Sequence, residues 1–398
     1  MQKWLNKDVL LISFSAFFSD LGYHTAIALF PIFLVITLKV PDYEFGFANA
    51  VAFGGGAIIA YFGGLLGDKY SYKWLAVSGN AFIPLLSLFG LVTSPVIAIF
   101  LFSGGWWARN FRTPPRRALL VRSTFPETRG KVFGFLHMLD IGGGMISIFT
   151  LLSLILIGLG YTQILLLSVI PLLIATILLL FTADIKGHSN NPGIAGTAAS
   201  NSNKDGKVFY TPAKKSAYKG IIIAASLYGF SSYAIGFPIL TIAQRSNDIL
   251  GIGSYALYLG VSAVIGFWIG SKKMDRVKTL GILGYLLSGF GTIMLGLAYF
   301  FHQSLFVFYV AVAILGFALG IIEVIEPTLI SFLKDIKDLG KGMGSLTASR
   351  SLGIFLANLI MGFLYIFNPL YSYTYAGLIS IAAAIIVLYY GKAYSLKI

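Results

Sequence analysis

Long uninterrupted apolar runs recur along the whole chain of 398 residues, and they limit its fold more than any other feature. Hydrophobic residues make up 57% of the sequence and charged residues only 11%, where a soluble domain carries about 25% charged residues. A run of about 20 apolar residues crosses a bilayer as a helix. A membrane β-barrel would instead show alternating segments of about ten residues. The unbroken runs therefore predict an all-α polytopic membrane protein.

Twelve transmembrane helices are predicted, six on either side of one long polar segment. That segment is rich in Gly, Ser, Asn and Pro and is typical of a flexible linker. We therefore expect an N-terminal six-helix bundle at residues 1–185, a cytoplasmic linker at 186–217 and a C-terminal six-helix bundle at 218–398. The predicted spans are 8–37, 43–66, 73–93, 95–115, 129–158, 162–183, 218–243, 249–271, 278–301, 303–333, 340–367 and 370–391.

The basic residues predict the orientation of these spans. With the N-terminus in the cytoplasm, 24 of the 29 Lys and Arg residues fall in the termini and cytoplasmic loops, and only two fall in outer loops. This positive-inside bias predicts that both termini are cytoplasmic in a multi-pass protein of the cell membrane. It also accounts for most of the net charge of +14 without a nucleic-acid partner. The absence of cysteine excludes disulfides and thiol catalysis.

The two halves share a repeated sequence pattern. "RGKVFGFLHMLDIGG" (129–143) and "LGKGMGSLTASRSLG" (339–353) align at a constant offset, and both begin the fifth span of their half. Internal repeats of this kind are typical of secondary transporters. The matched positions are Gly130 and Gly340, Lys131 and Lys341, Gly134 and Gly344, and Gly143 and Gly353.

A loop motif points to a known family. "GGLLGDKYSYKW" (63–74), between the second and third spans, resembles the G-x-L-x-D-R-x-G-R-R/K signature of the major facilitator superfamily. Gly64, Asp68, Lys69 and Lys73 match this signature in type. The resemblance implies that Asp68 forms a cytoplasmic gate with a basic residue near the fourth span, for which we expect Arg112, and with the start of the eleventh.

Three further stretches resemble a prokaryotic branch of that superfamily. They are "RNFRTPPRRALLVRSTFPETRGKVFG" (109–134), "SDLGYHTAIALFPIFL" (19–34) and "GIIEVIEPTL" (320–329). At Arg117 the branch usually has Asp, and at His24 it usually has Glu. The resemblance implies that spans one, four, seven and ten line a central cavity, but it names no substrate.

Four acidic residues fall inside predicted spans, where ionisable groups mark functional sites by default. Asp20 lies four residues before His24, and Glu323 three before Glu326, so each pair shares a helix face. The resemblance places the side chains of both pairs, but not that of Asp140, at the cavity. They could carry protons with His24 as a relay, bind a divalent metal, or form structural ion pairs. The fourth acid, Asp140, is expected to pair with its repeat counterpart Arg350 across the two halves.

Five arginines lie close together in residues 109–122. Arg109 and Arg112 share one face of a helix and should find carboxylate partners, because an unpaired charge there costs about 3 kcal/mol. Trp106, beside them, could bind a cationic or planar ligand or simply pack. The other three are Arg116, Arg117 and Arg122, which we expect to be positive-inside anchors.

Together these features predict a secondary transporter that moves a small molecule or ion by alternating access, coupled to protons and acting as an exporter. It should work as a monomer in the lipid bilayer, need no cofactor and not be an enzyme. One alternative is a divalent-metal exporter with Asp20, His24, Glu323 and Glu326 as ligands. Alternatives of another class are a non-transporting membrane sensor and a multi-pass membrane enzyme.

Overall fold

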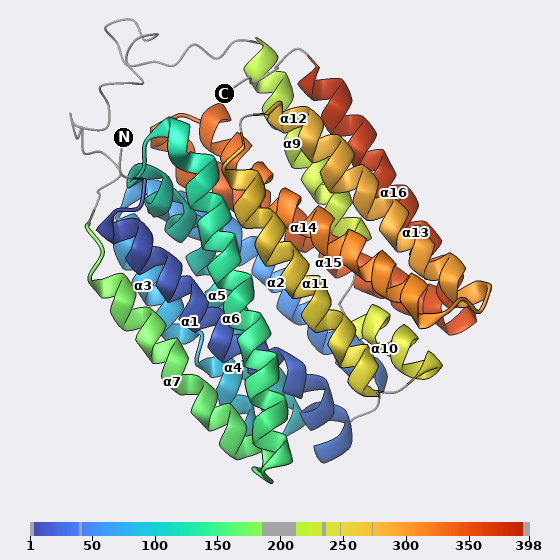
Figure 1. Ribbon diagram of the computed structural model, residues 1–398. Helices are drawn as coiled ribbons and strands as arrows, with labels where there is room; N and C mark the ends of the chain where they lie inside the picture. The colour runs from blue at the N-terminus through green and yellow to red at the C-terminus, as the bar shows by residue number, and fades with distance from the viewer. Residues whose placement is uncertain are drawn as a thin grey trace, which may run out of the picture.

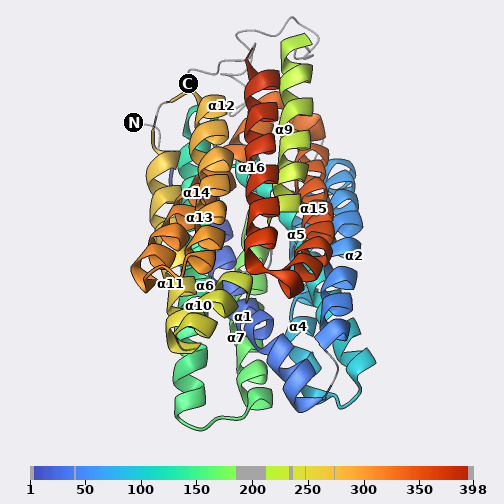
Figure 2. The ribbon, with the colours of Figure 1, turned by 90° about the vertical axis from the view of Figure 1, so that its right-hand side faces the viewer.

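The computed structural model describes residues 4–39, 42–184, 212–232, 236–246, 248–272 and 274–392, and they fold into long helices packed side by side (Figure 1). Most of the predicted linker 186–217 lies outside the described residues, namely residues 186–211. The start of α1 and the end of α16 lie at the same end of the molecule, which we call the termini end (Figures 1 and 2).

The N-terminal half supplies the first six spans. They agree with the predicted ones to within a few residues, except that the fourth helix continues to Arg122 instead of ending at 115. The elements are α1 (Lys7–Ile32) with the π-helix Phe33–Thr37, α2 (Asp42–Lys69), α3 (Tyr72–Phe82), α4 (Leu85–Leu88) with the 3₁₀ helix Phe89–Leu91, α5 (Pro95–Arg122), α6 (Arg129–Leu156) and α7 (Tyr161–Leu180).

Two prolines, Pro114 and Pro115, lie inside α5 without ending it. Pro115 has no N–H to donate to the carbonyl of Phe111, four residues earlier. That carbonyl lies against Gly63 of α2, so closely that a Cβ at this glycine would come within 2.3 Å of the oxygen. The close helix contact therefore covers the freed carbonyl.

The C-terminal half supplies the other six spans. The seventh is divided into two helices, with residues 233–235 between them outside the described residues. The elements are α9 (Pro212–Ser231), α10 (Gly236–Arg245), α11 (Asp248–Gly270), α12 (Arg276–Thr279) with the π-helix Leu280–Leu286, α13 (Leu287–Phe300), α14 (Leu305–Leu333), α15 (Leu339–Phe367) and α16 (Pro369–Gly391).

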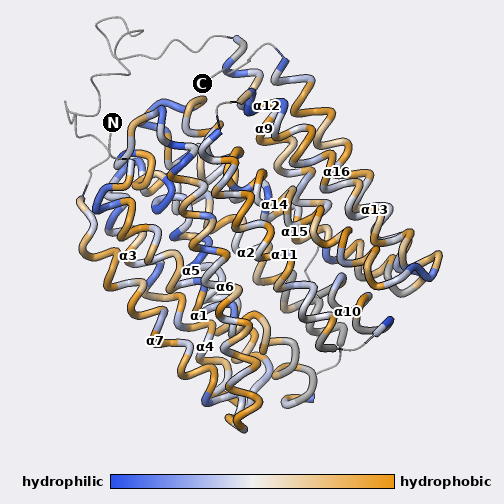
Figure 3. The backbone as a smooth tube through the Cα atoms, in the orientation of Figure 1, coloured by the Kyte–Doolittle hydropathy of each residue, from blue (hydrophilic) through white to orange (hydrophobic). Residues whose placement is uncertain are grey.

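The helices have the apolar surfaces that a bilayer requires. Eight spans in the described part of the chain are long and apolar enough to cross a membrane. Large apolar side chains such as Ile170 on α7, Phe290 on α13 and Ile385 on α16 are more than half exposed. Figure 3 shows apolar positions along most of each helix, with hydrophilic positions more frequent towards the termini end. These outer faces are suited to contact with lipid rather than water.

The two halves pack alike, which confirms the predicted pair of pseudo-symmetric bundles. In the N-terminal half α1 packs on α6 and α7, and α2 packs on α5. In the C-terminal half α9 packs on α15 and α16, and α11 packs on α14. The halves meet where α2 packs on α15 and α6 packs on α11.

The repeated glycines occupy equivalent close contacts. A Cβ at Gly143 would lie 2.2 Å from the carbonyl oxygen of Phe17 on α1, and a Cβ at its counterpart Gly353 would lie 2.4 Å from that of Ser226 on α9. The aligned glycines therefore mark positions where one helix of each half approaches another too closely for a side chain.

Candidate functional site

A chain of ion pairs joins the two halves inside the molecule. The guanidinium of Arg117 on α5 lies 3.1 Å from the carboxylate of Glu323 on α14. Glu323 also pairs with Arg350 of α15, and Arg350 pairs in turn with Glu326. The hydroxyl of Tyr285 donates to Glu326 at 2.5 Å. Both glutamates are thus held by arginine, and one of these ion pairs crosses between the halves.

Asp140 has a different partner from the one predicted. Its carboxylate accepts two hydrogen bonds from Arg116, at 3.2 and 3.1 Å, within the N-terminal half. The expected pair between Asp140 and Arg350 is not formed, because Arg350 meets two glutamates in its own half. Our interpretation of Arg116 and Arg117 as anchors beyond the hydrocarbon edge is also wrong, since both side chains form ion pairs inside the protein.

Arg112 has neutral partners in place of the carboxylate we expected. Its side chain is only 1% exposed and donates to the hydroxyl of Ser19 at 2.6 Å and to the amide oxygen of Asn80 at 2.7 Å. These three residues come from α5, α1 and α3, so the arginine ties three helices together. A structural role accounts for all of these contacts.

Arg109 lies among aromatic rings. Its guanidinium carbon is 5.0 Å from the ring centre of Tyr23 and 4.8 Å from that of Trp106, and its Nη2 donates to the Tyr23 hydroxyl at 3.3 Å. Cation–π contacts of this kind stabilise a buried guanidinium. The Nε atom of Arg109 and the indole Nε1 of Trp106 are buried without a hydrogen-bond partner among the described residues.

Asp20 and His24 form the remaining pair, on one face of α1. The imidazole Nε2 lies 3.6 Å from a carboxylate oxygen of Asp20, and the other ring nitrogen lies 3.3 Å from the hydroxyl of Tyr255 on α11. Asp20 is only 3% exposed, and its Oδ1 has no hydrogen-bond partner within the described part of the chain. Burying a polar atom in this way costs about 1–3 kcal/mol.

Several of these ionisable side chains are partly exposed. The exposed fractions are 12% for His24, 14% for Arg117, 15% for Arg350, 18% for Asp140 and 20% for Glu323. They belong to α1, α5, α6, α14 and α15, from both halves of the protein. Ionisable groups within membrane spans mark substrate or ion pathways, so these residues are candidates for the transport pathway.

The predicted gate residues lie where α2 meets α15. Asp68 accepts hydrogen bonds from the backbone N–H groups of Gly340 and Lys341, at 2.8 and 2.7 Å, and from the hydroxyl of Tyr72. It therefore binds the first turn of α15, where backbone N–H groups are free. A Cβ at Gly64 would lie 2.2 Å from the carbonyl oxygen of Gly340, so the helices touch at this point.

The other expected gate residues have different surroundings. Arg112 lies with Ser19 and Asn80, as described above, and the basic side chain beside the gate is Arg122. Its guanidinium lies 4.9 Å from the ring centre of Tyr72 and donates to the carbonyl of Ile336 in the other half. Lys69 and Lys73 lie over the rings of their neighbours Tyr70 and Trp74, each at 5.3 Å.

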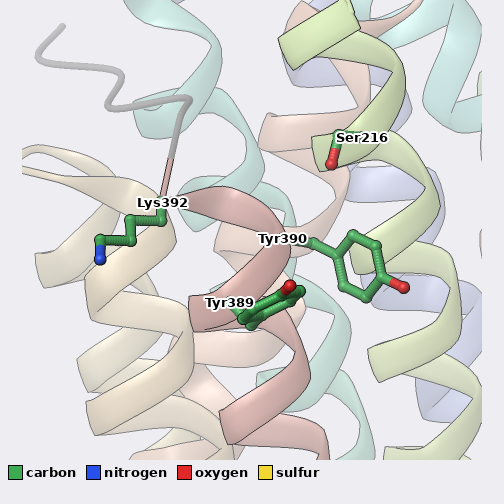
Figure 4. A pocket seen from close by; sticks show the side chains of 4 residues that line it. All are labelled: Ser216, Tyr389, Tyr390 and Lys392. Atoms are coloured by element: carbon green, nitrogen blue, oxygen red, sulfur yellow. The ribbon is translucent and has the colours of Figure 1, made fainter.

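The four proposed metal ligands do not come together. No group of three or more His, Asp and Glu side chains suited to a metal ion occurs in the described residues. Asp20 and His24 lie on α1, whereas both glutamates lie on α14 and pair with Arg350. A shallow depression at the termini end, between α9 and α16, is lined by Ser216, Tyr389, Tyr390 and Lys392 and contains none of these groups (Figure 4).

Sequence reasoning missed several members of this site. Tyr23, Tyr255 and Tyr285 gave no signal in the sequence, because tyrosines are numerous in this chain. Arg117 did give one, since a cation stands where the related branch has an acid, and a buried cation needs an anion nearby. Glu323 is that anion.

The sequence matches the family model of the Major Facilitator Superfamily over residues 12–336. The chain belongs to this family, and it is accordingly a multi-pass membrane transporter of small solutes rather than an enzyme. It is 24% identical over 397 residues to an uncharacterized MFS-type transporter of Methanocaldococcus jannaschii. That alignment covers 97% of this chain and 95% of the relative.

Solved structures of transporters share the fold. The human organic anion transporter MFSD10 superposes with a TM-score of 0.75 at 12% identity, covering 96% of this chain and 99% of that one. A double tryptophan mutant of XylE gives a TM-score of 0.73 at 15% identity, covering 98% and 96% of the two chains. The fucose:proton symporter FucP of E. coli gives 0.68 at 13% identity, covering 97% and 99%. At these identities the likeness establishes the fold alone.

Proposed function

We propose that this transporter couples the movement of a small solute to protons and exports the solute by alternating access. Two symmetry-related bundles, divided at the predicted linker 186–217, rock around the charged residues between them. The proposed functional unit is a monomer.

The surroundings of Asp20 carry the proposal of proton coupling. Asp140, Glu323 and Glu326 each form an ion pair with an arginine. Asp20 forms no such pair, and one of its buried oxygens has no hydrogen-bond donor in the described structure. We therefore assign the coupled proton to Asp20, the acidic side chain of the site that forms no ion pair with an arginine in the described structure. His24, 3.6 Å away, is placed to pass a proton to it.

The contacts at the termini end support a closed gate on that side. Gly64 meets Gly340, and Gly130 meets Gly270, where a Cβ would come within 2.3 Å of the opposite carbonyl oxygen. We place this end in the cytoplasm of a cell whose plasma membrane holds the protein, on the basis of the positive-inside distribution of Lys and Arg. The conformation is then closed to the cytoplasm.

Proton flux in liposomes tests the proposal. Purified full-length protein would be reconstituted with a pH-sensitive dye inside, and a panel of organic anions, organic cations and divalent metals would be added outside. Solute-dependent proton movement should occur with the wild type and fall at least tenfold with Asp20→Asn. Glu127→Gln, which neutralises an exposed carboxylate at the termini end, should retain the wild-type flux.

Solute movement without proton movement would refute the coupling, and so would full proton flux with Asp20→Asn. The direction of transport can be measured in vesicles whose transporter molecules all have the same orientation in the membrane. Export requires that solute loaded at the cytoplasmic face leave through the outer face. Solute that crosses only from the outer face to the cytoplasmic face would reverse the proposed direction.

A further inference from the structure

The surroundings of Arg109 contain hydrogen-bond donors with no acceptor to receive them. The Nε1 of Trp106 is buried and lacks a partner within the described residues, and the Nε of Arg109 lacks one too, as it does in eight other arginines there. The two side chains are in contact, since the guanidinium carbon lies 4.8 Å from the centre of the Trp106 ring. Donors left without acceptors in a protein interior mark a place where a ligand can supply the missing acceptors.

The charge around this place is positive. Among the described residues of the network, Asp140, Glu323 and Glu326 are paired with Arg116, Arg117 and Arg350. The cations left over are Arg109 and Arg112, and the only carboxylate left to face them is Asp20. The site therefore carries one excess positive charge when Asp20 is ionised and two when Asp20 is protonated.

Aromatic rings surround the same place. Tyr23 stacks on His24 with ring centres 4.9 Å apart, and Phe53 packs edge-on against Trp106 at 5.1 Å. Tyr255 of the other half reaches His24 at 3.3 Å. These rings offer apolar surface beside the cation, and they come from α1, α2, α5 and α11.

We propose that Arg109 and the indole N–H of Trp106 bind the carboxylate of an organic anion, whose planar apolar part lies among Tyr23, Phe53 and Tyr255. The guanidinium fork matches a carboxylate in geometry, and the indole supplies one further donor. This assignment rests on the proposed transport function and adds the class of substrate to it.

The charge of Asp20 is linked to binding at this site. The ionisable and charged groups that face Asp20 are His24 and Tyr23 on its own helix, Arg109 and Arg112 on α5, His137 and Asp140 on α6, and Tyr255 on α11. An ionised Asp20 competes with the substrate for Arg109, and a protonated Asp20 does not. Proton and anion therefore strengthen each other's binding, as linkage requires. Carried together, they leave the cell when the anion accumulates inside it.

Calorimetric titration of the full-length protein in detergent tests the site without requiring transport. The probes are benzoate, acetate and sulfate, with benzylammonium and benzyl alcohol as ligands of similar shape but different charge. Benzoate should bind, and the cation and the alcohol should not. Arg109→Gln should weaken benzoate binding at least tenfold, and Trp106→Phe, which keeps a ring but removes the N–H, should weaken it by about threefold or more.

Arg245→Gln is the matched control. Arg245 also lies over a tyrosine ring, 4.6 Å from the centre of Tyr299, but near the end of α10 and outside the charge network. This variant should bind benzoate like the wild type. Unchanged binding with both Arg109→Gln and Trp106→Phe would overturn the proposal. So would preference for benzylammonium, or the absence of binding for all three anions.

Asp20→Asn separates this proposal from proton coupling. At pH 8 the variant should bind benzoate several times more tightly than the wild type, because the competing charge is gone. Binding that depends on Arg109 but not on Asp20 would leave the anion site standing and remove the proton site. If proton flux depends on Asp20 but benzoate binding does not depend on Arg109, the proton site stands and the anion site is refuted.

Discussion

Arg117 of α5 and Glu323 of α14 form an ion pair 3.1 Å long between the two halves of the protein. Their exposed fractions are 14% and 20%, so the pair is largely shielded from water. Alternating access requires the halves to separate at one end and then at the other, and an ion pair between them has to break in one of these states. The pair therefore contributes to the balance between the two conformations.

Arg117→Gln should shift the protein towards the state that is open at the termini end. A hydrogen bond to a buried charged group contributes about 1.5–3 kcal/mol, which corresponds to a tenfold or larger change in population. The chain has no cysteine, so spin labels can be placed at Tyr70→Cys and Ile336→Cys, two exposed positions in different halves. Pulsed electron resonance should show longer distances in the variant.

The control for this experiment is Lys278→Gln. It removes an ion pair with Asp275 in which the lysine side chain is 73% exposed, and such a pair contributes little. The label distances should match those of the wild type. Equal distances in Arg117→Gln and Lys278→Gln would show that the buried pair does not affect the balance.

Asp68→Asn should weaken closure at the termini end. The carboxylate accepts from the N–H groups of Gly340 and Lys341, and a charged acceptor at the start of a helix is also favoured by the helix dipole. A cysteine placed at Met343, a fully buried position on α15, should react with a maleimide about tenfold faster when Asp68 is changed. Asp184→Asn, which removes the charge from a carboxylate bound only to Ser71 in the described contacts, should leave that rate unchanged.

The sequence predicted the fold closely, because the bilayer imposes long apolar helices and the glycines mark their contacts. The gate motif was predicted in part: Asp68 binds the start of α15 as expected, but Arg112 lies elsewhere. Pairing among the buried charges could not be predicted. Asp140 and Arg350 occupy equivalent repeat positions, yet each pairs with a side chain of its own half. Partner choice depends on side-chain reach across packed helices, which spacing along one helix does not reveal.

Gly64→Ala should prevent the termini end from closing. Its Cβ would lie 2.2 Å from the carbonyl oxygen and 2.9 Å from the carbonyl carbon of Gly340, and backbone atoms cannot move aside as a side-chain end can. The labels at positions 70 and 336 should report mainly the longer distance. Gly142→Ala gains the same methyl group in a helix, but no atom lies within 4 Å of it, so closure should persist. A short distance in both variants would contradict close packing at Gly64.

The pair of Arg116 and Asp140 should matter for stability rather than for the balance between states, because both residues lie in the N-terminal half. Removing one partner leaves a buried charge uncompensated, which costs about 3–5 kcal/mol. Arg116→Gln and Asp140→Asn should therefore each lower the melting temperature in detergent, measured by tryptophan fluorescence or size-exclusion after heating. The double variant leaves neither charge unpaired and should be more stable than either single one. Additive losses in the double variant would mean that the two side chains stabilise the bundle independently.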